Sequence, residues 1–189
     1  MNEITFKGKP LSLDGTPLEP GDTAPDFSLI RSDLGECHLS DLKEDYIVLN
    51  IVPSLDTPVC AASAREFNRQ AHDLDLNCRF LTISRDLPFA QSRFIQREDV
   101  HDMELLSDMR FSDFGREYGV LISSGPLKGL LARAVFLLGP ESDTSGHDSN
   151  ADSDSAGRNV LYREMIPEIA WEPDYRRILE VLYRENGDS

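Results

Sequence analysis

Hydrophobic positions along the chain follow two patterns: short apolar runs, and longer stretches in which apolar residues recur with helical spacing. The run YIVLNIV at 46–52 is apolar at nearly every position, as expected of a strand buried on both faces in the middle of a sheet. Shorter runs predict further strands at 79–84, 103–108, 131–138 and 159–166. Helical spacing is clearest at 58–74, 88–99 and 173–185.

Predicted strands and helices alternate through most of the chain, which ends with two strands and a helix. This order predicts an α/β fold with a mixed sheet covered on both faces, and it is typical of a thioredoxin-like domain. Before the first buried strand, ITFKGKPLSL alternates apolar and polar residues around Gly8, which predicts an N-terminal β-hairpin.

A length of 189 residues favours a single domain over 1–189. The 34 acidic and 19 basic residues give a net charge of −15, which argues against binding to nucleic acid or to an anionic membrane. Because no apolar run approaches the ~18 residues of a membrane span and the N-terminus lacks a signal-peptide pattern, we expect a cytoplasmic protein. Three cysteines without a close pair also favour a reducing compartment.

Residues 140–158 interrupt the periodic pattern. They are rich in Ser, Asp and Gly and lack large apolar residues, so we interpret them as an acidic, disordered loop between two strands. Asp148, Asn150 and Asp152 have the first spacings of a calcium-binding loop, but such a loop needs glycine where Ser153 stands. We therefore expect no metal site in this segment.

The stretch PSLDTPVC, from Pro53 to Cys60, connects the most apolar strand to the first predicted helix. Thr57 is a favoured N-cap residue, whose hydroxyl can accept a hydrogen bond from a free backbone N–H, and Pro58 fits the first helical position. Cys60 then takes the third position, where the helix dipole and unpaired N–H groups favour a thiolate. Helical spacing also places Cys60 at the end of the buried face of the helix.

Two interpretations of Cys60 are open at this point, because free cysteine is also a common small core residue. Arg133 bears on the choice, since its guanidinium lies within the apolar run LLARAVFLL and needs an anionic partner there. That partner is either an ordinary carboxylate or, if Arg133 faces the strand end near Cys60, the thiolate. Spacing alone allows both.

The spacing of Pro53, Thr57 and Cys60 resembles the active-site motif of the peroxiredoxins. Three further stretches resemble the thiol peroxidases, the atypical two-cysteine members of that family: SRDLPFAQSRF at 84–94, YGVLISSGPLKGLLARAVF at 118–136 and EPDYRRILEVL at 172–182. The resemblance covers nearly the whole chain apart from the acidic loop. It implies a thioredoxin-like fold, a homodimer, and an antioxidant enzyme that reduces hydrogen peroxide and organic hydroperoxides with thiol reductants and without a cofactor.

The resemblance also implies roles for single residues. Cys60 would attack the terminal oxygen of a hydroperoxide and become a sulfenic acid. Arg133 matches the active-site arginine of the family and would stabilise both the thiolate and the leaving oxygen. The Thr57 hydroxyl would orient the thiolate and the peroxide, and Pro53 would shield the sulfur from bulk water.

Ile95 departs from the family pattern, because thiol peroxidases usually carry a resolving cysteine at this place, directly after the aromatic residue of the second helix. Cys78 begins the strand at 79–84, and a parallel strand would place it far from Cys60, beyond the ~7 Å between Cα atoms that a disulfide allows. Cys37 is a weak substitute, with a simpler interpretation as an edge residue. We therefore predict that an external thiol, on thioredoxin or a small molecule, reduces the Cys60 sulfenic acid.

Two alternatives use the same fold. CAAS at 60–63 is a Cys-x-x-Ser arrangement at a helix start, which also suits a monothiol disulfide-exchange protein. Without a resolving cysteine, the protein could instead be a peroxide sensor that stays oxidised until a partner reduces it. A zinc site at Cys37 and His38 is not expected, because neighbouring residues of a strand point to opposite faces.

Overall fold

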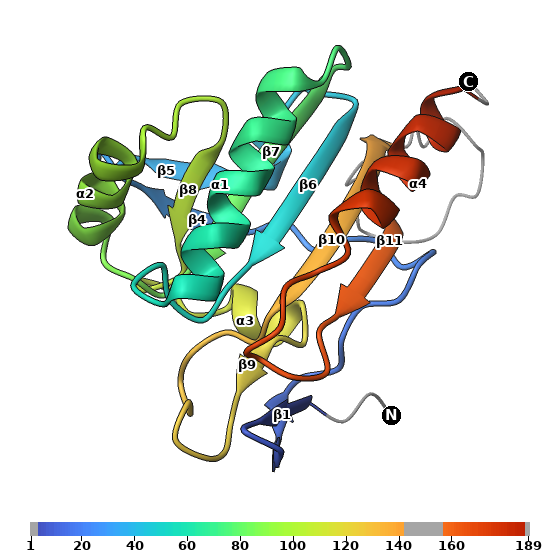
Figure 1. Cartoon of the computed structure of the whole chain (residues 1–189). Helices are drawn as coiled ribbons and strands as arrows, with labels where there is room; N and C mark the ends of the chain where they lie inside the picture. The colour runs from blue at the N-terminus through green and yellow to red at the C-terminus, as the bar shows by residue number, and fades with distance from the viewer. Residues whose placement is uncertain (1–3, 142–156, 188–189) are drawn as a thin grey trace.

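A seven-stranded mixed sheet forms the centre of the protein (Figure 1), in a computed structural model that describes residues 4–141 and 157–187. The strand order is β11-β10-β6-β7-β8-β4-β5. The three parallel strands are β6 (Tyr46–Ile51), β7 (Cys78–Ser84) and β8 (Glu104–Ser107). The strands antiparallel to their neighbours are β4 (Ser28–Arg31), β5 (Glu36–His38), β10 (Ala134–Glu141) and β11 (Arg158–Met165). The predicted mixed α/β sheet is confirmed.

Both faces of the sheet are covered, because successive side chains of a strand point to opposite sides. On one face Val48 of β6 belongs to a core that includes Phe67 and Ile178. Its neighbour Leu49 belongs to the core on the other face, together with Phe114. The first face carries the long helices α1 (Pro58–Asp73), α2 (Pro88–Glu98) and α4 (Tyr175–Gly187), and the second carries α3 (Phe114–Glu117) and the 3₁₀ helix η1 (Leu39–Asp41).

The N-terminal hairpin is also confirmed. β1 (Ile4–Phe6) pairs with β2 (Lys9–Leu11), and the turn uses Lys7 and Gly8 at φ values of 52° and 70°. Glu168, in the segment before α4, accepts hydrogen bonds from the backbone N–H groups of Lys7 and Gly8. The hairpin therefore holds the segment that leads from β11 to α4. A further small sheet joins β3 (Leu13–Asp14) to β9 (Leu121–Ile122).

The strand predicted at 131–138 begins later, at Ala134. Leu131 forms a bridge with Leu121, and the Ala132 N–H donates to the Val120 carbonyl, so these residues pair away from the main sheet. The prediction that Arg133 lies inside a strand was therefore wrong, because it lies immediately before one.

The ends of the acidic segment predicted at 140–158 are strand residues, because β10 continues to Glu141 and β11 begins at Arg158. This part of the prediction was wrong, since antiparallel pairing extends the hairpin beyond its apolar residues. Residues 142–156, with the three residues spaced as in a calcium loop, lie outside the described residues.

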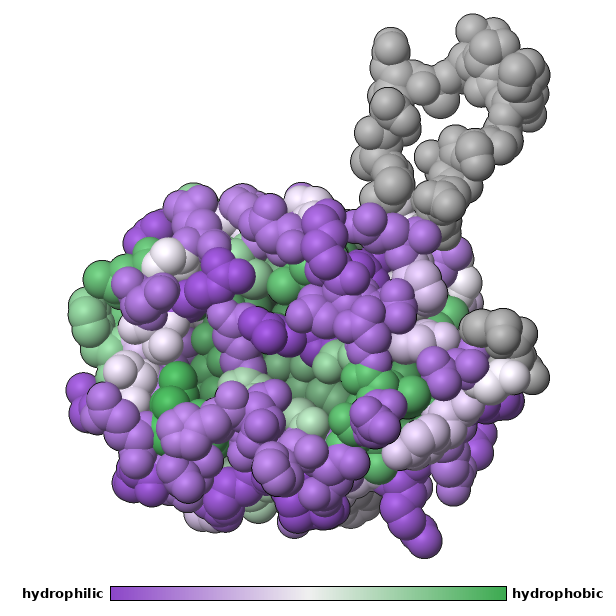
Figure 2. All heavy atoms as spheres, turned by 90° about the horizontal axis from the view of Figure 1, so that it is seen from above, coloured by the Kyte–Doolittle hydropathy of each residue, from purple (hydrophilic) through white to green (hydrophobic). Residues whose placement is uncertain are grey.

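Hydrophilic residues form most of the surface at the end of the molecule where α1 terminates (Figure 2), and apolar residues show in the hollow between them. This agrees with a composition that is 28% charged. Within residues 4–141 and 157–187, no helix is both long enough and apolar enough to cross a membrane.

Candidate active site

The first turn of α1 follows the end of β6 as the sequence predicts. Thr57 is the N-cap residue, with φ −101° and ψ 144°, and Pro58 takes the first helical position. Cys60 is therefore the third residue of the helix, where N–H groups lack intrahelical partners. The predicted cap bond is absent, however. The Thr57 hydroxyl instead donates to the Ser54 carbonyl at 3.1 Å, so its orientation is fixed by the loop and not by the helix.

Cys60 lies on the buried stripe of α1 with Ala64 and Phe67, and each of these residues is 0% exposed. Cys60 is thus fully buried, although it lies in the first turn of the helix. The loop 53–57 precedes α1. Its first residue, Pro53, is buried as well, whereas its last residue, Thr57, is exposed. Leu55, within the loop 53–57, belongs to the same buried core as Cys60.

Arg133 brings a buried positive charge to this sulfur. Its Nη2 donates to Cys60 Sγ at 3.1 Å, and its Nε donates to the Ile169 carbonyl at 3.0 Å. The residue is only 1% exposed. Within residues 4–141 and 157–187, no carboxylate forms an ion pair with Arg133, and its Nη1 has no hydrogen-bond partner. Of the two partners considered for Arg133, the structure supports the cysteine sulfur.

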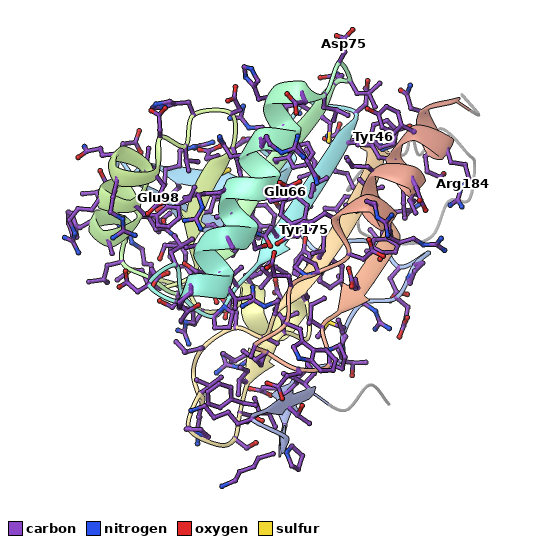
Figure 3. The ribbon with its side chains drawn as sticks, viewed as in Figure 1. Tyr46, Glu66, Asp75, Glu98, Tyr175 and Arg184 are labelled. Atoms are coloured by element: carbon purple, nitrogen blue, oxygen red, sulfur yellow. The ribbon has the colours of Figure 1, made fainter. Side chains whose placement is uncertain are left out.

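Tyr175, the first residue of α4, lies beside α1 (Figure 3). Its ring packs edge-on against Phe67 with centroids 5.2 Å apart, and its hydroxyl donates to Glu172 at 2.6 Å. Burial and then the hydrogen bond to Glu172 raise the pKa of Tyr175, while Arg133 and Ser63 act in the opposite direction. Tyr175 therefore remains a neutral phenol beside the site.

A buried polar chain lies beneath the first turns of α1. Ser63 Oγ donates to Asn50 Oδ1 at 3.0 Å, and Asn50 Nδ2 donates to Thr82 Oγ1 at 2.9 Å. The sequence analysis did not single out these residues, although Asn50 interrupts the apolar run YIVLNIV. They tie α1 to β6 and β7 close to Cys60.

Cys78 pairs with Tyr46, the first residue of β6. It therefore lies at the end of the sheet opposite Cys60, beside the labelled Tyr46 in Figure 3. The 16 residues of α1 span about 24 Å between these ends. Cys37 is in the edge strand β5, four strands from β6 and thus about 19 Å away in the plane of the sheet. Its side chain also belongs to the core on the face opposite Cys60.

Burial governs the chemistry of these two cysteines. Desolvation raises the pKa of Cys37 to about 11 and that of Cys78 to about 12. Ile95, where the sequence analysis expects the resolving cysteine of the family, is half-buried in α2 and packs against the core that contains Cys60. The described residues offer no group of three or more His, Cys, Asp or Glu side chains that could hold a metal ion.

Two further contacts were missed by the sequence analysis. The Ile169 carbonyl orients Arg133, but a backbone group leaves no signature in the sequence. Asp86 is the second residue after the predicted strand at 79–84 and binds the loop before Cys60. A signal was present here, because neighbouring parallel strands end at the same edge of a sheet. The residues that follow Ser84 at the end of β7 therefore had to lie near PSLDTPVC, which follows β6.

The chain is similar to known proteins over most of its length. The redoxin family matches residues 19–141. A thiol peroxidase of Oceanobacillus iheyensis is 40% identical over 182 residues, which cover 96% of this chain and 99% of the relative. A thiol peroxidase of Leptospira interrogans is 42% identical over 177 residues, covering 93% and 94%. Among solved structures, a peroxiredoxin-like protein from Aquifex aeolicus has a TM-score of 0.82 and 35% identity, covering 97% of both chains.

Proposed function

Because this chain belongs to the thiol peroxidase family of peroxiredoxins and has their thioredoxin-like fold, we propose that Cys60 is its peroxidatic cysteine. The chain is a peroxide-reducing enzyme that takes a hydroperoxide as substrate and a thiol as reductant. The observation that carries the proposal is the 3.1 Å contact between Arg133 Nη2 and Cys60 Sγ. The disulfide-exchange and sensor alternatives are not favoured, since the relatives are peroxidases over nearly their whole length.

In the proposed reaction the Cys60 thiolate attacks the terminal oxygen of the hydroperoxide. An S–O bond forms as the O–O bond breaks, the sulfur is oxidised by two electrons, and the leaving oxygen takes up a proton to become water or an alcohol. Charge builds on that oxygen, so a donor with positive charge in a dry site lowers the barrier. Arg133 Nη1, buried and without a partner in the described chain, is such a donor.

Thr57 and Pro53 have supporting roles in this proposal. The Thr57 hydroxyl gives its hydrogen to the Ser54 carbonyl, which leaves its oxygen lone pairs to accept the hydrogen of the peroxide. Such a contact would hold the terminal oxygen in line with the sulfur. Pro53 is buried in the same loop and excludes bulk water from the pocket.

The sulfenic acid is resolved, in our proposal, by an external thiol. The thiolate of this external thiol attacks Cys60 Sγ, and the S–O bond breaks as an S–S bond forms. The hydroxide that leaves takes up a proton to become water. A second thiol then reduces the mixed disulfide that remains on Cys60. The distant positions of Cys37 and Cys78 and the hydrophobic side chain of Ile95 support this route. Thioredoxin or a small-molecule thiol would serve as reductant.

The decisive experiment combines peroxide consumption with mass spectrometry. Cys60→Ser should lose all turnover of hydrogen peroxide with a thiol supplied. Wild-type protein given one equivalent of peroxide and then a small thiol should carry that thiol on Cys60. An intrachain Cys60–Cys37 or Cys60–Cys78 disulfide would contradict the resolving step, and activity in Cys60→Ser would contradict the nucleophile.

We also propose that the protein is a cytoplasmic homodimer in which residues 1–189 act as one domain. Exposed apolar side chains support the dimer. They come from the loop after β7 (Leu87), the first turn of α2 (Phe89) and the loop after β8 (Met109 and Phe111). These loops are joined by a hydrogen bond between Arg85 and Ser112. The three free cysteines fit a reducing compartment. Sedimentation of wild type and Phe89→Asp tests the dimer, which the charge should weaken.

A further inference from the structure

The carboxylate of Asp86 holds the loop that precedes Cys60. Its Oδ1 accepts a hydrogen bond from Ser54 Oγ at 2.7 Å. Its Oδ2 accepts from the Leu55 N–H at 2.7 Å and from Ser84 Oγ at 2.9 Å. Bonds of this length to a carboxylate are charge-assisted and stronger than bonds between neutral groups. The loop 53–57 is therefore fixed from the end of the neighbouring strand β7.

A chain of hydrogen bonds leads from this carboxylate to the first turn of α1. The Ser54 carbonyl accepts from the Thr57 N–H at 3.2 Å and from Thr57 Oγ1 at 3.1 Å. The Thr57 carbonyl accepts from the N–H of Ala61, the residue after Cys60, at 2.9 Å. Asp86 is thus linked to the position of the sulfur through Ser54 and Thr57.

Residues of the neighbouring strands and of α2 fix the position of Asp86 in turn. Ser107 Oγ donates to the Asp86 carbonyl at 2.6 Å. The buried Gln91 Nε2 donates to Ser84 Oγ at 3.2 Å and to the Leu106 carbonyl at 2.9 Å. These partners belong to β7, β8 and α2, which pack into the sheet. These bonds fix the position of Asp86 relative to the sheet.

Because Cys60 is buried, the position of the loop that Asp86 holds should affect both steps of catalysis. Hydrogen peroxide is smaller than an external thiol and needs a smaller opening to reach Sγ, whereas the thiol must bring its sulfur to about 2 Å from Sγ in the product disulfide. Cys60 is 0% exposed, and Leu55 of the loop 53–57 belongs to the same buried core. We infer from this that the loop 53–57 moves when such a thiol reaches the sulfur. The peroxide step, by contrast, needs Thr57 and Arg133 held in place.

We propose that Asp86 is a positioning residue that favours the closed loop, and thereby speeds the peroxide step while it slows reduction by an external thiol. The proposal rests on the proposed function, because it takes an external thiol as the resolving group. Loss of the carboxylate should move the two half-reactions in opposite directions. A residue that only stabilised the fold would change the active fraction, and both half-reactions would fall together.

The test compares wild type with Asp86→Asn, Asp86→Ala and Ser54→Ala. The matched control is Asp75→Asn, which makes the same charge change at an exposed residue at the far end of the molecule (Figure 3). Reduced enzyme is mixed rapidly with hydrogen peroxide to measure the first half-reaction. Peroxide-treated enzyme is mixed with 2-mercaptoethanol to measure the second. Alkylation of reduced Cys60 by iodoacetamide reports opening of the loop directly.

Asp86→Ala should slow the peroxide step about 10- to 100-fold, the cost of misplacing reacting groups by about 1 Å. The same variant should react faster with 2-mercaptoethanol and with iodoacetamide. Asp86→Asn keeps one oxygen acceptor and should lie between Asp86→Ala and wild type. Ser54→Ala removes one donor of three and should show smaller changes of the same signs, which gives a test even where Asp86→Ala folds poorly.

Equal slowing of both half-reactions in Ser54→Ala and Asp86→Asn would overturn the proposal, as would unchanged rates in folded Asp86→Ala. Failure of the proposed function has a different signature. In that case the oxidised wild-type enzyme is not reduced by 2-mercaptoethanol, or it already contains an intrachain disulfide, whichever residue stands at position 86.

Discussion

Arg133 and Cys60 are 73 residues apart in the sequence, yet Nη2 of the arginine lies 3.1 Å from the cysteine sulfur. The Ile169 carbonyl holds Nε of the same guanidinium, so the charge is oriented as well as close. One planar group can in this way contact the sulfur with Nη2 and present Nη1 to a substrate. In the proposed mechanism, one side chain would thus stabilise both the nucleophile and the leaving oxygen.

Replacing Arg133 should therefore damage the peroxide step strongly. We expect Arg133→Gln to lower kcat/KM for hydrogen peroxide about 100-fold or more, the usual effect of losing a positioned donor at a developing negative charge. Arg133→Lys should recover little, because one ammonium group cannot reach both the sulfur and the Ile169 carbonyl. Stopped-flow rates measure the effect, with exposed Arg184→Gln as control (Figure 3). Near-normal rates in Arg133→Gln would contradict the assigned role.

Cys37 and Cys78 should be dispensable for turnover. Burial raises their pKa values to about 11 and 12, so both remain thiols at neutral pH, and both lie far from Cys60 in the sheet. We expect a Cys37→Ser, Cys78→Ser double variant to keep wild-type peroxide turnover with an external thiol. Any loss of stability should be judged separately by thermal melting. Loss of turnover in the folded variant would show that one of these thiols takes part.

Local signals in the sequence were sufficient for the start of α1. An apolar run, Thr57 as N-cap and Pro58 at the first helical position depend only on neighbouring residues, and the structure has both residues in these positions. The side chain of Thr57 could not be predicted, because the Ser54 carbonyl competes for its hydroxyl only after the loop has folded. Tertiary contacts decided that detail.

The elements that the sequence analysis missed are short. β4 has four residues and α3 has four, too few for a periodic pattern, and they are stabilised by pairing and packing with distant segments. The position of Arg133 beside Cys60 has the same origin, since it depends on β10 pairing with β6. The residues alone left a carboxylate or the Cys60 thiolate as the partner of Arg133, and only the family resemblance favoured the thiolate before the structure.

Restoring a thiol at position 95 should change the resolving step. Ile95 packs against the core that contains Cys60, so Ile95→Cys places a second thiol on the same face of the sheet. We expect this variant to form an intrachain disulfide with Cys60 after peroxide and to turn over faster with thioredoxin. Ile95→Ser is the matched control, because it has a similar size without the thiol. Equal turnover of the two variants would show that resolution does not limit the wild-type enzyme.

Asp108 should make the stability of the fold depend on pH. It follows β8, is 1% exposed, and has Arg85 Nε at 3.9 Å. Burial raises the pKa of Asp108 from 3.8 to about 6, and Arg85 offsets only part of this shift. The folded state thus binds this proton more tightly than the unfolded state. The stability that Asp108 contributes is complete below pH 3.8 and is lost as the pH rises through about 6.

Asp108→Asn keeps the shape of the neutral acid and should remove this dependence. At pH 8 we expect it to be more stable than wild type, by up to about 3 kcal/mol for a difference of about two pKa units. At pH 4 the two proteins should have nearly the same free energy of unfolding. Urea denaturation at pH 4, 6 and 8 measures the free energy of unfolding of both proteins. The difference between the two free energies at each pH cancels the effect of the large net charge. An Asn variant that is less stable than wild type at pH 8 would mean that the ion pair with Arg85 outweighs the burial of the carboxylate.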